Sequence, residues 1–372
     1  MVFDYDTVIV GAGTAGLSAG RILHESGKNY IILDSKERIG VPIRSTGGVS
    51  EYFVHKLKMP VNDEIVSARI RSVGIQNDNG DLTVMRYDHD VGYVYDFTKY
   101  EQYLAKGLNI ELNTRVLKIA HNEIGTTKGN VTARNIIIAS GPTTSLTSMK
   151  KKPQDIDMIV GYEETRRLPP RADFDISFWL SRHAPGGYVW DFPDRNNLRR
   201  IGIGVVKQSR ENPVSALGDF TRDHPELTGE VHHTISHLIP VAHPPSKVVF
   251  GNIMIVGDAA NSVFASTGGG LQGATWSGQL AGKAASMDNP EMYQREWRSE
   301  LYPVLLDHYR IKKIFYTVPK KKVLDIPKIL RTFRAKTGND LIEIPRLMKH
   351  VILHSPSIML YAIQAGCTRS FY

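Results

Sequence analysis

A glycine-rich turn near the start of the chain carries the clearest sign of chemistry. The run Gly11-Ala12-Gly13-Thr14-Ala15-Gly16 follows an apolar, β-branched segment at Tyr5–Val10, and a second apolar segment at Tyr30–Leu33 ends directly before Asp34. The three glycines would permit a tight turn, close approach of a pyrophosphate and close packing of a helix on a strand. The carboxylate can accept hydrogen bonds from ribose hydroxyls. Because strand, turn, helix, strand and acid are all in register, we predict a dinucleotide site here rather than a structural loop.

A second group of residues with chemical potential follows an apolar segment at 252–256. Asp258 comes directly after this segment, and its burial there requires polar partners, such as the hydroxyls of a ribityl chain. Gly268, Gly269 and Gly270 then lead into a helix predicted over 268–285, whose free N–H groups and dipole favour an electron-rich group. The N1–C2=O edge of a reduced isoalloxazine ring is such a group. A structural turn before a glycine-rich helix is the alternative interpretation.

Three aromatic residues alternate along one predicted strand. Tyr188, Trp190 and Phe192 would therefore share one face of a sheet, with Gly186 and Gly187 leaving room beside them. Such a face can line a long apolar pocket. From the pattern alone, an ordinary aromatic sheet core is the preferred interpretation.

The elements that must position these groups suggest a dinucleotide-binding domain interrupted by insertions. Alternating segments on either side of Asn79-Gly80 predict a β-hairpin within 65–95, and residues 97–106 are expected to form a helix. The continuous apolar runs at 135–139 and 252–256 are typical of parallel strands. We therefore expect strands before residue 140 and after residue 250 to join one sheet, with a β-rich region between them.

Composition narrows the class of protein. The chain has 372 residues, of which 41% are hydrophobic and 23% charged, values ordinary for a folded protein of more than one domain. Its one cysteine, Cys367, excludes an intrachain disulfide, and no metal site is predicted because His232, His233 and His237 lack a further ligand at useful spacing. The first residues lack a secretory signal, and no apolar run approaches the roughly 20 residues of a membrane span. We therefore expect a cytoplasmic protein.

The positive charge is concentrated near the C-terminal end. The segment 310–350 carries a net charge of +9, compared with +8 for the whole chain, and apolar residues are interleaved with its basic ones. No nucleic-acid module accompanies the segment, so nucleic acid is not a predicted partner. The pattern favours an anionic membrane surface, which would hold the protein at the inner face of the cell membrane. Solvated helix faces over a small core are the alternative.

Four motifs together resemble those of a known family. Besides the N-terminal turn, Pro42, Arg44 and Gly48 resemble a Pro-x-Arg-Cys-x-x-Gly loop, and Asp258 with the triple glycine resembles a second FAD motif. The most specific match is Tyr-x-Trp-x-Phe-Pro, at residues 188–193. The chain resembles the flavoproteins that include p-hydroxybenzoate hydroxylase, and among them the geranylgeranyl reductase family.

This resemblance implies non-covalent FAD and reduction of C=C bonds in an isoprenoid or lipid substrate. It implies a substrate pocket with Tyr188, Trp190 and Phe192, and with Ser45 where the family has a cysteine; Ser45 or Thr46 would be a weaker acid than that cysteine. NAD(P)H and a ferredoxin-like protein are the alternative electron donors. The implied FAD-binding residues are Gly11, Ala12, Gly13, Thr14, Ala15, Gly16, Asp34, Ser35, Arg44, Val116, Ser140, Gly141, Asp258, Gly268, Gly269, Gly270 and Leu271.

The predicted fold class is α/β with α+β character: a Rossmann-type FAD-binding domain, an inserted antiparallel β-sheet substrate domain and a helical C-terminal region. The FAD-binding domain is expected at residues 1–60, 96–157 and 250–287. The substrate domain is expected at 61–95 and 158–249, and the C-terminal region at 288–372. Two other functions fit parts of the pattern. An aromatic hydroxylase shares the fold, although the aromatic motif argues against it. An electron-carrying flavoprotein without reductase activity would explain the missing loop cysteine.

Overall fold

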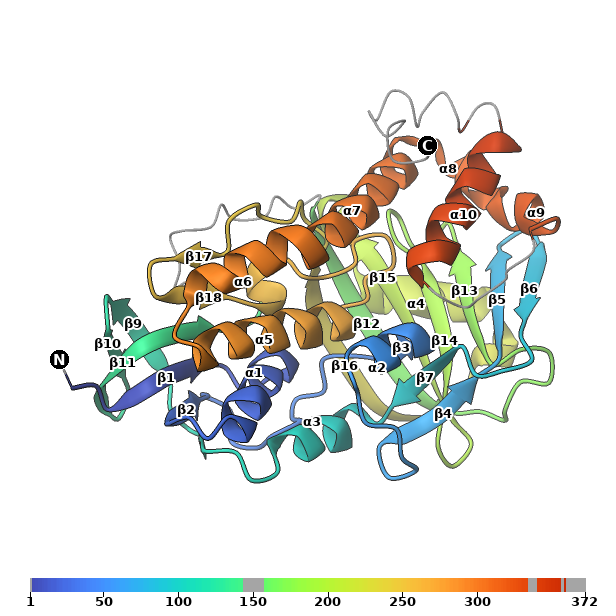
Figure 1. Cartoon of the computed structure of the whole chain (residues 1–372). Helices are drawn as coiled ribbons and strands as arrows, with labels where there is room; N and C mark the ends of the chain where they lie inside the picture. The colour runs from blue at the N-terminus through green and yellow to red at the C-terminus, as the bar shows by residue number, and fades with distance from the viewer. Residues whose placement is uncertain (1, 143–156, 334–339, 356–357, 359–372) are drawn as a thin grey trace. The chain divides into compact units, whose positions relative to one another are not determined.

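The computed structural model describes residues 2–142, 157–333, 340–355 and 358. The chain divides into two compact units. The first contains Met1–Ser45, Phe97–Pro153 and Pro240–Leu306; the second contains Thr46–Asp96, Gln154–Ile239 and Asp307–Tyr372. Parallel and antiparallel sheets occur together with helices, so the predicted mixed α/β fold class is confirmed (Figure 1). The assignment of separate cofactor, substrate and C-terminal domains stays a prediction.

The first unit is built on a sheet with the order β17-β18-β11-β1-β2-β8. Its central strands β18, β11, β1, β2 and β8 run parallel, so the expected union of strands from before residue 140 and after residue 250 is confirmed. The antiparallel strands β9 and β10 extend β11. The strands of this sheet are β1 (Tyr5–Val10), β2 (Tyr30–Leu33), β8 (Ile110–Glu111), β9 (Val116–Ala120), β10 (Glu123–Thr126), β11 (Gly129–Ile138), β17 (Val249–Phe250) and β18 (Ile253–Ile255).

Helices α1 (Thr14–Glu25) and α5 (Leu271–Ser286) pack side by side in this unit (Figure 1). Their backbones approach so closely at Gly278 that a Cβ atom there would lie 2.2 Å from the carbonyl oxygen of Ala15. Helix α5 begins at Leu271 rather than at the predicted residue 268, because Gly269 still pairs with Phe264 in an isolated β-bridge. The remaining helices here are α3 (Phe97–Ala105), α6 (Pro290–Glu296), a π-helical turn (Trp297–Leu301) and the start of α7 (Tyr302–Thr317).

The second unit contains a seven-stranded sheet with the order β16-β12-β15-β14-β13-β5-β6. Antiparallel ladders join β12 to β15, β15 to β14 and β14 to β13, whereas β13 and β5 run parallel. The long antiparallel part brings the aromatic strand β14 next to β15. The strands are β5 (Ser72–Asn77), β6 (Leu82–Arg86), β12 (Met158–Arg167), β13 (Ile176–Leu180), β14 (Val189–Asp194), β15 (Leu198–Val206) and β16 (Val231–Pro240).

The segment 65–95 forms more than the predicted hairpin. The hairpin itself is present, with β5 and β6 joined around Gly80, but the apolar run before it breaks at Arg71. The part before the break, β4 (Val66–Ile70), pairs with β7 (Gly92–Tyr95) in a separate three-stranded sheet. The third strand of that sheet is β3 (Gly48–Ser50), and it continues into helix α2 (Glu51–Lys56).

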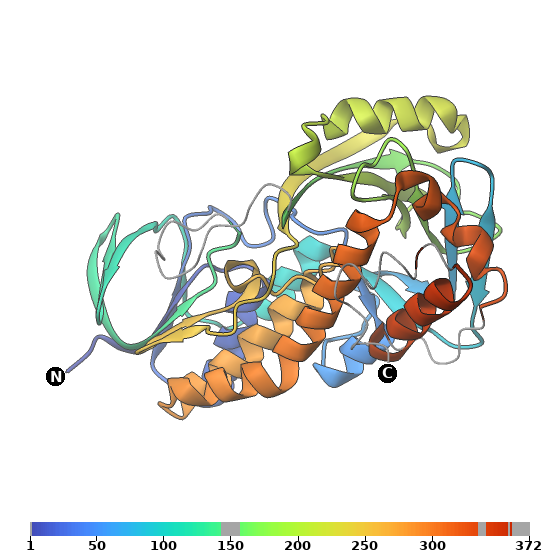
Figure 2. The same cartoon turned by 90° about the horizontal axis from the view of Figure 1, so that it is seen from above.

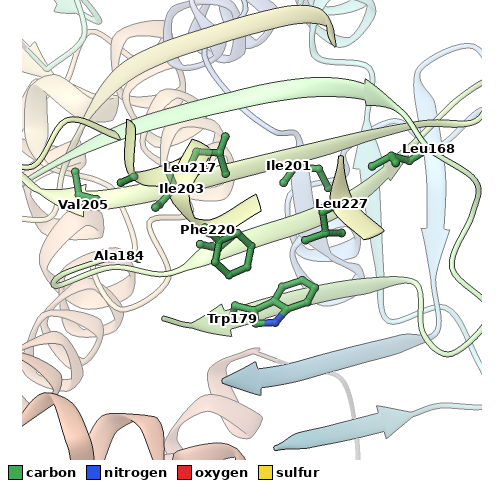
Figure 3. Close-up of a cluster of buried hydrophobic side chains, with 11 residues drawn as sticks. Leu168, Trp179, Ala184, Ile201, Ile203, Val205, Leu217, Phe220 and Leu227 are labelled. Carbon is green, nitrogen blue, oxygen red and sulfur yellow. The ribbon is translucent and has the colours of Figure 1, made fainter. Parts of the chain in front are cut away.

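One face of the seven-stranded sheet is covered by helix α4 (Pro213–Asp223), as seen from above in Figure 2. The helix begins after Asn212, whose side chain accepts a hydrogen bond from the Val214 N–H and so caps the first turn. Phe220 of this helix packs edge-on against Trp179 of β13, with ring centroids 5.7 Å apart (Figure 3). Leu217, Ile201 and Ile203 are fully buried in the same cluster, which fixes this part of the sheet beneath the helix.

Described apolar side chains of the helices after residue 306 form a buried cluster, which also packs against β5, β6 and β13. These helices are the rest of α7, α8 (Lys320–Leu324), α9 (Ile326–Leu330) and α10 (Asp340–Leu353). Ile314, Leu330 and Val351 are each at most 1% exposed. Among the described residues, no helix combines the length and apolar character that a membrane span requires.

Candidate functional site

The glycine turn in the first unit has an open side at Gly13. Gly11 has a φ of +110°, and a Cβ atom there would lie 2.3 Å from the carbonyl oxygen of Ala139. Within the part of the chain that the structure describes, a Cβ atom on Gly13 would meet only Glu101 Oε1, at 3.8 Å. The backbone is therefore accessible where a dinucleotide pyrophosphate must approach the N-terminus of α1. This geometry fits FAD.

Asp34 holds the glycine turn to the end of β2. Its Oδ2 accepts a hydrogen bond from the Ala12 N–H at 2.6 Å, and its Oδ1 accepts one from the Lys36 N–H at 2.8 Å. Each carboxylate oxygen has a second lone-pair site for another donor, such as a ribose hydroxyl. The side chain is only 16% exposed, so it is fixed in place before any ligand arrives.

A buried acid beside the turn was not foreseen from the sequence. Glu101 of α3 is 4% exposed and accepts a hydrogen bond from the Thr14 hydroxyl at 3.1 Å. Lys36 Nζ lies 3.7 Å from Glu101 Oε2 and donates to the Ala12 carbonyl oxygen at 2.5 Å. Burial raises the pKa of Glu101, although the positive charge of Lys36 opposes the shift. Glu101 could have been found from helix spacing, because positions 97, 100, 101 and 104 lie on one helix face, which is buried.

The other predicted FAD residues of the first unit lie at strand ends or in loops. Ser140 and Gly141 follow β11, and the buried Ser140 hydroxyl has no hydrogen-bond partner among the described residues. A Cβ atom on Gly141 would lie 4.0 Å from Arg44 Nη1. Val116 is a buried residue at the start of β9, and Ser35 is exposed directly after Asp34.

The second predicted motif lies between β18 and α5. Asp258 belongs to a short 3-10 turn, Gly257–Ala260, and its Oδ1 would lie 3.7 Å from a Cβ atom on Gly270. Gly270 is the N-cap of α5, and neither an acidic residue nor a side-chain hydrogen bond caps the first turn. Since Gly268 has a φ of +67°, the chain turns sharply there before Gly269 and the helix. The carboxylate and the N-terminus of α5 are thus close together.

The second unit contains the aromatic face. Tyr188 directly precedes β14, and its ring lies 6.0 Å from that of Trp190, centroid to centroid. Phe178 of β13 meets Tyr188 at 5.3 Å and Phe192 at 5.6 Å, both edge-to-face. Trp190 and Phe192 are 7% and 8% exposed. The three predicted aromatic residues therefore form one surface, completed by Phe178.

A buried carboxylate is attached to this aromatic face. Glu163 of β12 is 3% exposed, and its Oε2 accepts hydrogen bonds from Trp190 Nε1 at 2.7 Å and from the Thr46 hydroxyl at 2.5 Å. Glu163 and Trp190 both pair with Gly202, the residue between them on β15. The indole thus crosses one whole strand to reach the acid.

Arg200 fixes the backbone next to this acid. Its Nη1 donates to the carbonyl oxygens of Thr46 and Tyr95, and its Nε donates to Asp194 Oδ2 at 2.9 Å. A Cβ atom on Gly48 would lie 2.6 Å from the ring of Phe192. The segment from Thr46 to Gly48 is therefore packed directly against Phe192, at one end of the aromatic motif.

Sequence reasoning assigned Ser45 to the substrate pocket and named Thr46 with it as a weak acid; the structure places the buried acid Glu163 beside Thr46. Ser45 is half-buried and ends a segment of the first unit; Thr46 begins the second. The sequence carried no clear signal for Glu163: it lies in an inward position because buried residues alternate at 159, 161 and 163 along β12, and this is apparent only in the folded strand. Within the described ranges, no three His, Cys, Asp or Glu residues are grouped closely enough to hold a metal ion.

Comparison with known proteins finds two family models that match this chain. Residues 6–82 match the family model described as FAD binding domain, and residues 157–238 match the geranylgeranyl reductase catalytic domain. The resemblance inferred from the motifs is confirmed. With these two domains, the chain is an FAD-dependent oxidoreductase that resembles the geranylgeranyl reductases.

Individual proteins give the same picture. A digeranylgeranylglycerophospholipid reductase of Methanococcoides burtonii is 26% identical over 356 residues, which cover 84% of each chain. One from Methanococcus aeolicus is 24% identical over 391 residues, covering 96% of this chain and 97% of that one. The crystal structure of a geranylgeranyl bacteriochlorophyll reductase-like protein from Thermoplasma acidophilum shares the fold, with a TM-score of 0.86 at 21% identity, covering 97% of this chain and 99% of the other.

Proposed function

We propose that this protein reduces the C=C bonds of a polyprenyl lipid of the geranylgeranyl type. The observation that carries the proposal is the aromatic face of Tyr188, Trp190 and Phe192, which bears the Tyr-x-Trp-x-Phe-Pro signature inside the region matched to the geranylgeranyl reductase catalytic domain. The names of the methanogen relatives support a phospholipid with geranylgeranyl chains as the substrate class.

FAD is the cofactor, and when reduced it supplies a hydride to one carbon of the alkene. The turn from Gly11 to Gly16 would hold its pyrophosphate, and Asp34 with Ser35 would hold its adenosine ribose. Arg44, Val116, Ser140 and Gly141 would complete that part of the site. Asp258 would accept hydrogen bonds from the ribityl chain, and the segment from Gly268 to Leu271 would stabilise negative charge on the reduced ring.

The residues of the second unit would bind the lipid and exclude water. Aromatic rings offer large apolar surfaces with few rotatable bonds, which suits a long hydrocarbon chain. Tyr188, Trp190 and Phe192 would pack against the isoprene units. Ser45 and Thr46 are the hydroxyl residues that would take the place of an acidic thiol in the loop.

The basic C-terminal segment would hold the enzyme at an anionic membrane surface, where its substrate resides. Lys313, Lys321, Lys322, Lys328 and Lys349 are exposed. Lys312 is buried and donates to Asp157 Oδ1 at 2.8 Å, so it does not contribute to this surface. The apolar side chains of this segment that the structure describes pack mainly into a buried cluster, so the attachment would rely on charge rather than on inserted side chains. NAD(P)H or a ferredoxin-like protein would supply the electrons.

Anaerobic single-turnover reduction tests the function. The purified holoenzyme is photoreduced, mixed with a geranylgeranyl phospholipid, and followed by flavin absorbance and mass spectrometry. We expect flavin reoxidation together with a lipid that has gained two hydrogen atoms per reduced bond. Reoxidation only by oxygen, with hydroxylation of an added phenol, would instead identify an aromatic hydroxylase. Reoxidation by an electron acceptor with unchanged lipid would identify an electron carrier.

A further inference from the structure

Glu163 has surroundings that differ from those of a structural ion pair. The carboxylate lies beneath the aromatic face, and no hydrogen bond joins it directly to Arg200, the cation that acts on it most strongly. Instead, its Oε2 meets two neutral groups, the Trp190 indole N–H and the Thr46 hydroxyl. A buried acid with neutral partners is more readily protonated than one held by a bidentate guanidinium.

The charges around Glu163 point in the same direction. Burial raises its pKa above the ordinary value of 4.5, and the nearby carboxylate of Asp194 raises it further. The positive charge of Arg200 and the two hydrogen bonds lower it without reversing the shift. Arg200 is itself paired with Asp194 at 2.9 Å, which reduces its effect on Glu163. Together these effects shift the carboxyl group toward its protonated form, relative to an exposed glutamate.

The Thr46 hydroxyl connects this acid to the surface of the second unit. Glu163 is buried, whereas Thr46 is partly exposed and lies directly after Ser45 in the loop that resembles the family's cysteine-containing loop. The oxygens of Thr46 and Glu163 are 2.5 Å apart, and a hydroxyl can donate and accept hydrogen bonds at once. When the carboxyl is protonated it can donate to Thr46, which leaves the threonine proton free to point outward.

We propose that Glu163 holds the proton that alkene reduction requires and passes it through the Thr46 hydroxyl to the substrate. This inference rests on the proposed function. Thr46 is the residue that would touch the alkene, and Glu163 is a positioning residue that acts through it. Trp190 then has two roles, since its ring faces the hydrocarbon and its N–H orients the acid.

The step balances as a two-electron reduction. One alkene carbon receives a hydride from reduced FAD, and the other carbon forms a C–H bond with the Thr46 hydroxyl proton as that O–H bond breaks. The Glu163 carboxyl O–H bond breaks in the same event and restores the threonine hydroxyl. Glu163 is left as a carboxylate, and solvent returns its proton after the turnover. The π bond of the alkene is replaced by two C–H bonds.

The test replaces Glu163 in the holoenzyme and measures single turnovers as a function of pH. Glu163→Gln keeps an oxygen that can accept from Trp190 and Thr46, but it carries no transferable proton. We expect product formation to slow by about 10²-fold or more, the usual scale of general acid catalysis. The FAD content and the rate of photoreduction should not change. The wild-type rate should fall as pH rises through the pKa of Glu163, and the variant should lose this dependence.

Two further variants separate proton supply from structure. Glu163→Asp restores an acid and should recover part of the rate together with the pH dependence. Glu164→Gln changes the adjacent carboxylate, which pairs with Arg166 rather than with the aromatic face, and should leave the pH profile unchanged. Thr46→Ser should retain the reaction, and Thr46→Val should lose it to about the same extent as Glu163→Gln.

A direct readout of the carboxyl group does not depend on turnover. Infrared difference spectra between low and high pH should contain a protonated carboxyl band that is absent from Glu163→Gln. If that band is missing, or if Glu163→Gln turns over at the wild-type rate, the inference is overturned. If the band is present but wild-type enzyme leaves every polyprenyl lipid unreduced, then the proposed function fails, and transfer to an alkene fails with it.

Discussion

A Cβ atom on Gly202 would lie 2.2 Å from the indole ring of Trp190, its cross-strand partner. The absence of a side chain at this one position lets the indole lie across β15 and reach Glu163 on β12. The backbones of Trp190 on β14 and Glu163 on β12 are separated by two strand spacings, about 9.6 Å. The hydrogen bond between the aromatic motif and the buried acid therefore depends on Gly202, which lies outside the motif.

Gly202→Ala should displace the indole and break its hydrogen bond to Glu163. Overpacking of this kind costs about 1–3 kcal/mol, so urea unfolding should show a lower free energy of unfolding by that amount. Gly204→Ala on the same strand is the matched control, because the nearest atom to its Cβ is a methyl carbon of Ile159 at 3.1 Å. Equal losses in the two variants would contradict the special role of Gly202.

Gly13→Val should abolish FAD binding while the chain still folds. Among the described residues its Cβ atom meets only Glu101 Oε1, at 3.8 Å, so the protein accommodates a side chain that a bound pyrophosphate could not. The absorbance ratio of flavin to protein after desalting measures the loss, and circular dichroism checks the fold. Gly218→Val, on the exposed side of α4 with no atom within 4 Å of its Cβ, should keep one FAD per chain. Stoichiometric FAD in Gly13→Val would show that the glycine motif had been misread.

The parts of the fold that the sequence predicted are those with local signals. The strand from Tyr5 to Val10 has the predicted bounds, and a helix follows the glycine turn as predicted, because apolar periodicity and the turn determine both. The break at Arg71 was missed. On either side of it the chain alternates in the same way, and only the pairing of β4 with β7 and of β5 with β6 separates them. Such tertiary pairing leaves no local mark.

The part of the site that lies within a single sequence motif could be predicted. Tyr188, Trp190 and Phe192 alternate within five residues, so their shared face followed from strand geometry. Glu163 lies 27 residues away from Trp190 along the chain, and it joins the motif only through the register of β12, β15 and β14. Contacts between distant strands need that register, which the sequence of either strand alone does not specify.

Glu101 should make the stability of the protein depend on pH. Its folded-state pKa is raised by burial, so the stability it contributes is complete below its ordinary value of 4.5 and is lost as pH rises through the folded pKa. Glu101→Gln removes the ionisation. Its free energy of unfolding relative to wild type should therefore increase with pH, by up to about 1.4 kcal/mol per pH unit within that window.

Urea unfolding of the FAD-free protein between pH 4 and pH 8 measures this difference. The exposed Glu37 provides the matched control, Glu37→Gln, whose difference from wild type should not follow the same curve. A Glu101→Gln difference that grows as pH falls would mean that Glu101 is instead stabilised as the ionised partner of Lys36, which lies 3.7 Å away.

The basic segment after residue 312, in which Lys321 and Lys322 are exposed, should bind the protein to anionic lipid. Each basic residue near such a surface contributes about 1 kcal/mol, so changing Lys320, Lys321 and Lys322 to Glu should weaken liposome binding by about 10²-fold or more. Binding by the wild-type protein should rise with the anionic lipid content and fall as salt screens the charges. Co-sedimentation measures all three dependences.

The matched control makes the same charge change at Lys28, Lys106 and Lys118 in the first unit, and it should weaken binding much less. Equal loss in both variants would indicate a response to net charge alone. If none of the three dependences appears, the basic segment is a solvated surface and the membrane proposal fails, while the FAD site is unaffected.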